Sequence, residues 1–95
     1  MFGLNPTAIK ILEYLHNERN NGLKYGTVIT KRTNTTFFCV IENLRILREK
    51  GLVERDEKFN RVKRKKFYKL TKKGEEVANL IVKLRLLMRE NGLGN

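Results

Sequence analysis

The stretch LRILREKGLVER, residues 44–55, joins a helical pattern to a strand pattern at a single glycine. Leu44 and Leu47, with Val40 one turn earlier, recur at the spacing of one face of a helix. Gly51 suits the left-handed position just beyond a helix end, and the apolar residues that follow it are typical of a short strand. The stretch therefore predicts a helix that passes directly into a β-strand.

A second strand pattern follows the first after a polar, turn-like segment. That segment is DEKFNRVKR, residues 56–64, and it leads to KFYKLT, residues 66–71, where basic and apolar side chains alternate. Two short strands on either side of such a segment predict an antiparallel hairpin with a long tip. Thr71 is a suitable N-cap for a final helix over residues 72–91, which Gly92 is expected to end.

Helical signals also precede the central stretch. In the opening segment LNPTAIKILEYLHNERNNG, Asn5 is a candidate N-cap, and Pro6 occupies the first helical position, where its missing N–H costs nothing. A short helix is predicted over residues 27–32. The long helix of the central stretch is expected to begin after Asn34 or Thr35 as its cap.

The composition excludes several classes of protein. With 95 residues, 40% of them apolar and 33% charged, the chain has room for one domain, residues 1–95. Its 21 lysines and arginines against 10 acidic residues give a net charge of +11. This charge indicates a polyanionic partner, with nucleic acid favoured over an anionic membrane surface.

One cysteine and one histidine form no disulfide framework or metal constellation, so we expect no cofactor and no enzymatic activity. Without a signal peptide or a long apolar run, we expect a cytoplasmic, nucleoid-associated protein with no membrane partner.

The predicted order of elements is helix, helix, helix, hairpin, helix, so the fold class is α+β and mostly α. A short helix, a tight asparagine turn and a longer helix form a helix-turn-helix unit over about residues 27–50. The hairpin attached to it, over about residues 52–71, is a wing. Three helices and the hairpin make up the predicted winged helix-turn-helix, and the final helix, over about residues 72–91, follows it as a C-terminal dimerisation helix.

The motifs LRILREKGLVER and FYKLTKKG resemble those of winged-helix DNA-binding domains. The chain is similar to MarR-type transcription regulators and to small archaeal winged-helix proteins that dimerise through a C-terminal helix. The resemblance covers residues 7–91 and implies a DNA-binding protein with a C-terminal dimerisation helix. In MarR-type proteins a wing arginine reaches into the minor groove, which implies that role for Arg64, although Val62 stands where an aspartate often orients the arginine.

The predicted wing carries a high density of cations. Cations set against the phosphates of duplex DNA release condensed counterions, so a basic hairpin edge favours DNA binding. A solvated edge that deters sheet-to-sheet aggregation is the alternative interpretation. Phe59 and Val62 near the tip either pack on the hairpin, wedge into a groove or touch a partner. The residues predicted to contact the DNA backbone and minor groove are Lys31, Arg32, Lys58, Arg61, Lys63, Arg64, Lys65 and Lys66.

The helix after the asparagine turn is the predicted recognition helix. Arg45 suits a bidentate contact with guanine, Phe38 suits a thymine methyl group, and Glu42 either accepts from cytosine N4 or holds Arg45 in place. If the helix is rotated slightly from this assignment, Phe38 and Ile46 are instead core residues. The predicted base-reading set is Asn34, Thr35, Thr36, Phe38, Glu42 and Arg45.

The final helix carries more apolar side chains than one small domain can cover. They recur at a heptad-like spacing, and a second copy of the chain would bury them in a two-fold dimer. Such a homodimer would set two recognition helices against successive major grooves, about 34–36 Å apart. The alternative is a helix packed only on its own domain. The predicted dimer interface is Val77, Leu80, Ile81, Leu84, Leu87 and Met88.

Two potentially reactive side chains receive structural interpretations. Cys39 lies near the start of the recognition helix, and no cationic cluster in the sequence singles it out as a thiolate, so it is interpreted as a small half-buried filler. His16 lies on the apolar side of the first helix and is expected to be packed with one ring nitrogen satisfied.

These observations lead to the hypothesis of a sequence-specific transcription regulator that binds double-stranded DNA as a homodimer. Its recognition helix would lie in the major groove, and its wing on the backbone and minor groove. One alternative is a non-specific architectural protein of the chromatin type. Another is a winged-helix module for protein interaction, with its cations serving RNA or an acidic protein. The sequence identifies no small-molecule effector.

Overall fold

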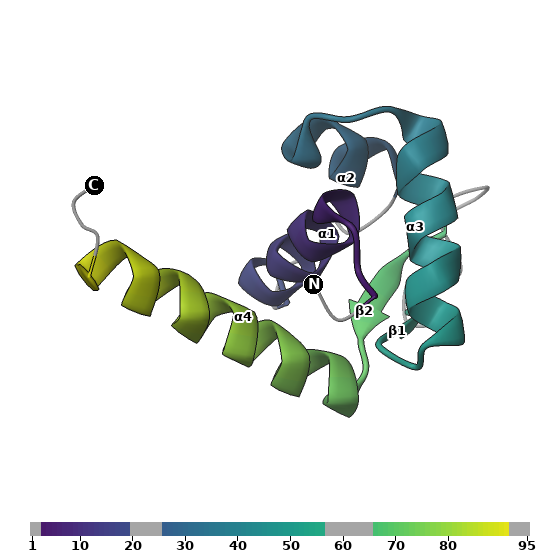
Figure 1. Cartoon of the computed structure of the whole chain (residues 1–95). Coiled ribbons are helices and arrows are strands. Elements are labelled where there is room, and N and C mark those ends of the chain that lie inside the picture. The colour runs from purple at the N-terminus through teal and green to yellow at the C-terminus, as the bar shows by residue number, and fades with distance from the viewer. Residues whose placement is uncertain (1–2, 20–25, 57–65, 92–95) are drawn as a thin grey trace.

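The computed structural model describes residues 3–19, 26–56 and 66–91, and within them it has four helices and one two-stranded sheet in the predicted order. Figure 1 shows α1 at the centre of the molecule, with α2 and α3 to one side and α4 extending along the other. The fold is therefore a mostly α, winged helix-turn-helix, as predicted. The elements are α1 (Pro6–Asn17), α2 (Gly26–Thr33), α3 (Phe37–Glu49), β1 (Val53–Arg55), β2 (Tyr68–Leu70) and α4 (Lys72–Asn91).

Helix α1 begins where the sequence predicts because Asn5 and Pro6 act together. The side-chain oxygen of Asn5 accepts the Ala8 backbone N–H at 2.9 Å, and Pro6 is the first helical residue. The apolar residues of α1 form the middle of the core, with Ile11 and Leu12 fully buried. Since α1 contacts α2, α3 and α4, it connects the helix-turn-helix unit to the final helix.

The turn between α2 and α3 contains one residue in the left-handed conformation. Asn34 has a φ of 55°, which asparagine tolerates better than most residues. The N-cap of α3 is Thr36, whose hydroxyl oxygen accepts the Cys39 backbone N–H at 3.1 Å. The expectation of Asn34 or Thr35 as the cap is therefore wrong. A cap needs extended backbone, and Thr36 has it, with a φ of −89° and a ψ of 155°.

Gly51 ends α3 as predicted and has a φ of 76°. Beyond it, the Leu52 backbone N–H donates to the Leu47 carbonyl at 2.9 Å, which closes the last turn of the helix. The chain then enters β1, which pairs antiparallel with β2 so that Val53 lies opposite Leu70. The predicted hairpin is thus confirmed at its base, while its tip, residues 57–65, lies outside the described residues.

The start of α4 is fastened to the end of α3 through Thr71. The Thr71 hydroxyl donates to the Gly51 carbonyl at 2.6 Å and accepts the Gly74 backbone N–H at 3.0 Å, so Thr71 caps α4 as predicted. The Thr71 backbone N–H also donates to the Leu52 carbonyl at 3.0 Å. These bonds fix the direction in which α4 leaves the hairpin.

Two side-chain contacts hold α4 against α1 before the helix projects beyond the domain. His16 Nδ1 lies 2.9 Å from Glu75 Oε1, so His16 has the satisfied ring nitrogen expected from the sequence. Further along, Arg85 forms an ion pair with Glu13. In Figure 1 the C-terminal part of α4 extends away from the other elements, which agrees with principal extents of 46 × 26 × 24 Å.

Candidate nucleic-acid interface

The buried face of α3 determines which of its side chains are available to a partner. Val40, Leu44 and Leu47 are each at most 1% exposed, as the sequence predicts for the inner stripe. Phe38 and Arg45 lie on the opposite face and are exposed. The alternative in which Phe38 is a core residue is wrong, because this residue is 74% exposed. The prediction that Val40, Leu44 and Leu47 form the inward face of α3 is therefore confirmed.

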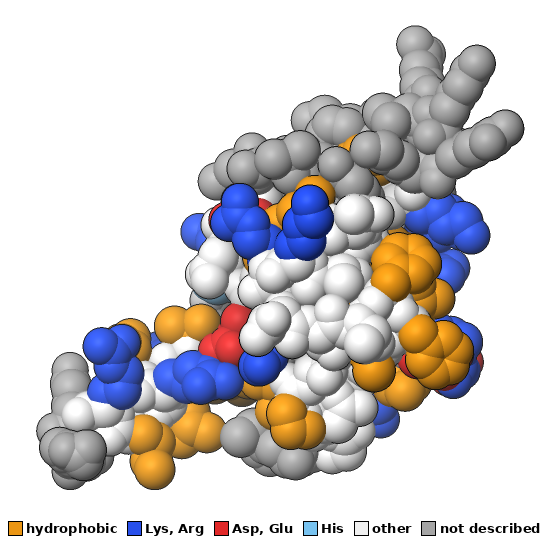
Figure 2. Space-filling view, turned by 90° about the horizontal axis from the view of Figure 1, so that it is seen from above, with side chains coloured by type: hydrophobic (Ala, Val, Ile, Leu, Met, Phe, Trp, Pro, Cys, Tyr) orange, Lys and Arg blue, Asp and Glu red, His pale blue; other side chains and the backbone are white. Residues whose placement is uncertain are grey.

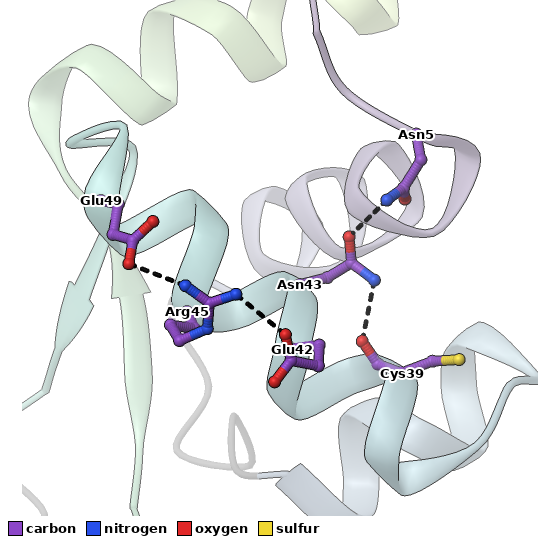
Figure 3. Close-up of polar contacts among 6 residues, drawn as sticks. All are labelled: Asn5, Cys39, Glu42, Asn43, Arg45 and Glu49. Atoms are coloured by element: carbon purple, nitrogen blue, oxygen red, sulfur yellow. Dashed lines mark hydrogen bonds and ion pairs between the residues drawn. The ribbon is translucent and has the colours of Figure 1, made fainter.

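Arg45 is held between two carboxylates on the outer face of α3. Its Nη2 donates to Glu42 Oε1 at 2.9 Å, and its Nη1 donates to Glu49 Oε2 at 2.8 Å, as Figure 3 shows. The hydrogen bond and charge of Glu42, followed by those of Glu49, raise the pKa of Arg45 above its usual value. Glu42 thus takes the second of its two expected roles. Glu49 was not predicted, although its position four residues after Arg45 is the spacing at which helical ion pairs form.

A buried asparagine connects α3 to the start of α1. Asn43 accepts a hydrogen bond from the Asn5 side-chain amide at 2.8 Å and donates to the Cys39 carbonyl at 2.8 Å, and both bonds are drawn in Figure 3. Asn43 was not predicted either, although it lies three residues after Val40, on the inner side of the helix. Because Asn5 also caps α1, the two asparagines fix where α3 lies against that helix.

The N-terminal half of α3 exposes three apolar side chains. Phe37 is 54% exposed, Phe38 74% and Ile41 36%. A Cβ atom at Gly26 would lie 2.8 Å from Cε1 of Phe37 and 3.5 Å from Cδ1 of Ile41, so these two residues cover the first turn of α2. Phe38 was predicted from the sequence, but Phe37 and Ile41 were not, because their exposure depends on how closely α2 approaches α3.

The turn residues that precede α3 lie beside this exposed apolar region. Asn34 and Thr36 are exposed, and Thr35 is half-buried. Lys31 is exposed at the end of α2, and its carbonyl accepts the Asn34 backbone N–H at 3.4 Å. The structure therefore brings a cation and the polar turn residues to the N-terminal end of α3.

The other basic residues predicted to contact the DNA backbone are only partly described. Arg32 is exposed and lines a hollow with residues of α1, including Lys10, so it lies away from the outer face of α3. Lys66 is exposed at the foot of the hairpin. Lys58, Arg61, Lys63, Arg64 and Lys65 lie outside the described residues.

A polar hollow between α3 and β1 adds cations that were not predicted from the sequence. It is lined by Arg45, Arg48 and Glu49 of α3 and by Glu54 and Arg55 of β1. Arg48 lies one turn after Arg45, but Arg55 reaches the same hollow only because the hairpin folds back beside the helix. Figure 2 shows basic side chains next to exposed hydrophobic ones on the side of the molecule where α3 lies.

The predicted dimer interface on α4 divides into buried and exposed residues. Ile81 is 5% exposed and belongs to the core of its own domain, and Val77 packs half-buried beside it. Because α4 turns one side toward α1, Ile81 is not available to a second chain. Hydrophobic side chains also line the projecting part of α4 in Figure 2. The exposed members of the predicted set are Leu80, Leu84, Leu87 and Met88.

Other types of site are absent from the part of the chain that the structure describes. No three His, Cys, Asp or Glu side chains gather there in a way that would hold a metal ion. None of the described helices is both long enough and apolar enough to span a bilayer. Cys39 is half-buried, which agrees with its interpretation as a small filler.

Comparisons with known proteins agree with this geometry. A family model described as HxlR-like helix-turn-helix matches residues 11–93. A comparison with curated protein sequences finds no match.

Solved structures share the fold. MepR, a transcription regulator of the Staphylococcus aureus multidrug efflux pump MepA, superposes with a TM-score of 0.76 at 25% identity over 87% of this chain and 58% of its own. A MepR–DNA complex gives 0.74 at 25% identity, over 87% and 65%. AF1382 from Archaeoglobus fulgidus gives 0.78 at 24% identity, over 93% of both chains. The resemblance to winged-helix regulators is thus confirmed, and the chain spans less than two thirds of the length of these MepR chains.

Proposed function

Since the chain belongs to the HxlR-like helix-turn-helix family, we propose that it is a transcription regulator that binds duplex DNA through α3. The observation that carries the proposal is the exposed outer face of α3 in a chain with a net charge of +11. A field of that sign attracts a phosphate backbone. The MepR–DNA complex supports the proposal, because its protein has the same fold and is 25% identical to this chain. The proposed role involves no catalysis.

In the proposed complex, α3 enters the major groove with its N-terminal end leading. The N-terminal end of the helix and the exposed side chains of Asn34 and Thr36 suit the phosphates beside the groove. Lys31 adds a cation at the same end. The wing cations among residues 58–66 contact neighbouring phosphates, with Arg64 in the minor groove.

The proposed regulator is a homodimer whose two chains pair through the projecting part of α4. The support is the exposure of large apolar residues there, with Leu80 and Met88 each 66% exposed. A folded chain rarely leaves such a series of leucines in water, and a two-fold dimer removes them from it. Two α3 helices related in this way would read half-sites about 34–36 Å apart, so a palindromic site is expected.

A second candidate function, non-specific coating of DNA, is favoured by the two ion pairs of Arg45. With this guanidinium bound to Glu42 and Glu49, the main hydrogen-bond donor on the outer face of α3 is occupied. A protein that uses its cations only on phosphates would bind unrelated duplexes equally well. The spread of affinities among unrelated sequences therefore separates the two functions.

The test is fluorescence anisotropy with a set of unrelated duplexes of about 25 bp, each titrated at several salt concentrations. Wild type is compared with the variant Lys63→Ala/Arg64→Ala/Lys65→Ala/Lys66→Ala. Log K is expected to fall steeply against log salt, and the variant is expected to flatten the slope by about 0.9 for each phosphate that it no longer binds. The control variant Lys83→Ala/Arg89→Ala removes two exposed cations from α4 and is expected to keep the wild-type slope.

Each result of this experiment has a distinct meaning. Steep salt dependence with affinities that differ between duplexes supports the regulator. Equal affinities for all duplexes replace it with the architectural protein. If wild type binds no duplex even at low salt, the DNA proposal fails and the exposed face of α3 belongs to a protein partner.

A further inference from the structure

We propose that α3 recognises the 5-methyl groups of thymine through an apolar cluster formed by Phe37, Phe38 and Ile41. The inference rests on the proposed function and names the feature of the bases by which the same helix selects its sites. It gives a binding role to Phe37 and Ile41, which lie beside the predicted reader Phe38. It also implies that the preferred sites contain thymines where the N-terminal half of α3 meets the major groove.

The apolar cluster has a fixed position on the surface. Phe37 and Ile41 lie against the first turn of α2, because only a glycine at position 26 leaves room for them there. Phe38 follows Phe37 on the same turn of α3 and is the most exposed of the three, at 74%. Three large apolar side chains exposed at one end of a helix are typical of an interaction site.

Several hydrogen-bonding side chains in and beside α3 are already engaged in this structure. Arg45 donates to both Glu42 and Glu49, and Asn43 is buried with partners of its own. The Thr36 hydroxyl oxygen accepts the N–H that caps the helix. In the N-terminal half of α3, the apolar cluster is therefore the feature that is most open to contact with a base.

Charge determines which kind of partner fits this cluster. The cluster lies at the N-terminal end of α3, where the helix dipole favours an anion, and Lys31 stands beside the turn that leads into it. An anionic partner with apolar groups on its surface matches this surrounding better than an apolar protein surface does. In the major groove of duplex DNA, the apolar group that a protein side chain can contact is the thymine methyl.

The test removes the methyl group and leaves the rest of the base unchanged. An alternating A·T duplex of about 25 bp is compared with the same duplex containing dU in place of dT, using fluorescence anisotropy at fixed salt. The comparison is repeated with a site selected from a random duplex pool, in which dT is replaced by dU one position at a time. Removal of one buried methyl group is expected to weaken binding about fourfold, on the basis of about 0.8 kcal/mol per buried carbon group.

Variants locate the effect on the protein. In Phe38→Ala, replacement of dT by dU is expected to have no further effect at the position that Phe38 contacts, since the two changes remove the same interaction. The matched control Leu86→Ala truncates another exposed apolar side chain, on α4, and is expected to retain the full wild-type sensitivity to dU. Circular dichroism checks that both variants are folded, and the dU comparison with wild type needs no variant at all.

The possible outcomes separate this inference from the function on which it rests. Weaker binding to dU duplexes in wild type but not in Phe38→Ala supports methyl recognition. Equal binding of dT and dU duplexes by a protein that still prefers a selected site overturns the inference and leaves the regulator intact. Equal binding of dT and dU duplexes with no preference among sequences overturns both methyl recognition and the sequence-specific regulator. If Phe38→Ala binds dT duplexes and loses affinity for dU duplexes as wild type does, Phe38 contacts no methyl group and the inference is overturned.

Discussion

In the proposed complex, Arg45 is the residue whose partners most change what α3 would offer to DNA. Its guanidinium is the group on this helix best suited to guanine, but both of its hydrogen-bonding edges point to carboxylates of the same helix. To read a base, Arg45 must leave Glu42 or Glu49, and the carboxylate left behind repels phosphate. The two glutamates therefore limit how much hydrogen-bonded recognition α3 can provide.

The variant Glu42→Gln/Glu49→Gln is expected to strengthen binding to sites with guanine under α3. Freed from two carboxylates, Arg45 is expected to improve discrimination for guanine about tenfold, within the range of one bidentate arginine–guanine pair. The measurement is the ratio of Kd values for duplexes that differ at that base pair. The control Glu18→Gln/Glu76→Gln makes the same charge change away from α3, and an equal ratio in both variants would contradict the prediction.

Asn43 links α3 to the start of α1 through Asn5, so Asn43→Ala is expected to destabilise the fold. The change removes one acceptor and one donor in a buried setting, at a cost of about 1–3 kcal/mol. For a domain of this size, each kcal/mol lowers Tm by about 4–8 °C. Thermal denaturation at one protein concentration measures the effect. Asn79→Ala, at an exposed position of α4, serves as control, and similar Tm values for the two variants would count against the role of Asn43.

At the scale of elements, the junction between the hairpin and α4 depends on close backbone contact. A Cβ atom at Gly74 would lie 2.0 Å from the Leu52 carbonyl oxygen, which already accepts the Thr71 backbone N–H. The first turn of α4 thus rests directly on the strand end that follows α3. Through this contact, the direction of α4 is tied to that of α3.

Gly74→Ala is therefore expected to lower the free energy of unfolding by about 1–3 kcal/mol or more, because backbone atoms must shift to make room. Helix propensity alone predicts the opposite sign, with a gain of about 1 kcal/mol for alanine. Urea denaturation distinguishes the two signs. Lys72→Ala changes an exposed residue of the same turn and is expected to leave stability nearly unchanged. Unaltered or higher stability in Gly74→Ala would show that the junction has room to adjust.

At the scale of the whole molecule, α4 has two faces with different surroundings. One face packs on α1 through Ala78 and Ile81, and the other leaves its leucines in water. The C-terminal part of α4 extends beyond the other elements and makes the molecule elongated in that direction, as Figure 1 shows. In the proposed dimer, the exposed face would set the distance between two α3 helices.

Leu87→Glu is expected to convert the proposed dimer into a monomer, because it would place a carboxylate in an apolar interface. Sedimentation velocity across a range of protein concentrations measures the association. Leu86→Glu is a closely matched control, since the neighbouring leucine is 50% exposed but lies on a different side of α4 from the seam of Leu80, Leu84 and Leu87. Equal association of both variants, or a monomeric wild type, would rule out this interface.

Local signals in the sequence determined the elements and the overall character of the molecule. Asn5 with Pro6, Gly51 and Thr71 each mark an element boundary through contacts with residues a few positions away, so the pattern of neighbours was sufficient to predict them. The inner stripe of α3 followed from helical periodicity alone. The net charge of +11 needs no fold to indicate a polyanionic partner.

Tertiary structure alone decided which side chains of these elements remain open to a partner. Ile81 looks equivalent to Leu84 in the sequence, but only Ile81 is covered, since α1 approaches one side of α4. Asn43 becomes a structural residue because Asn5, 38 positions away, reaches it. Phe37 lies against the first turn of α2 because Gly26 has no side chain there. Periodicity reports only contacts within about one helical turn, whereas burial and polar pairing depend on residues far apart in the chain that folding brings together.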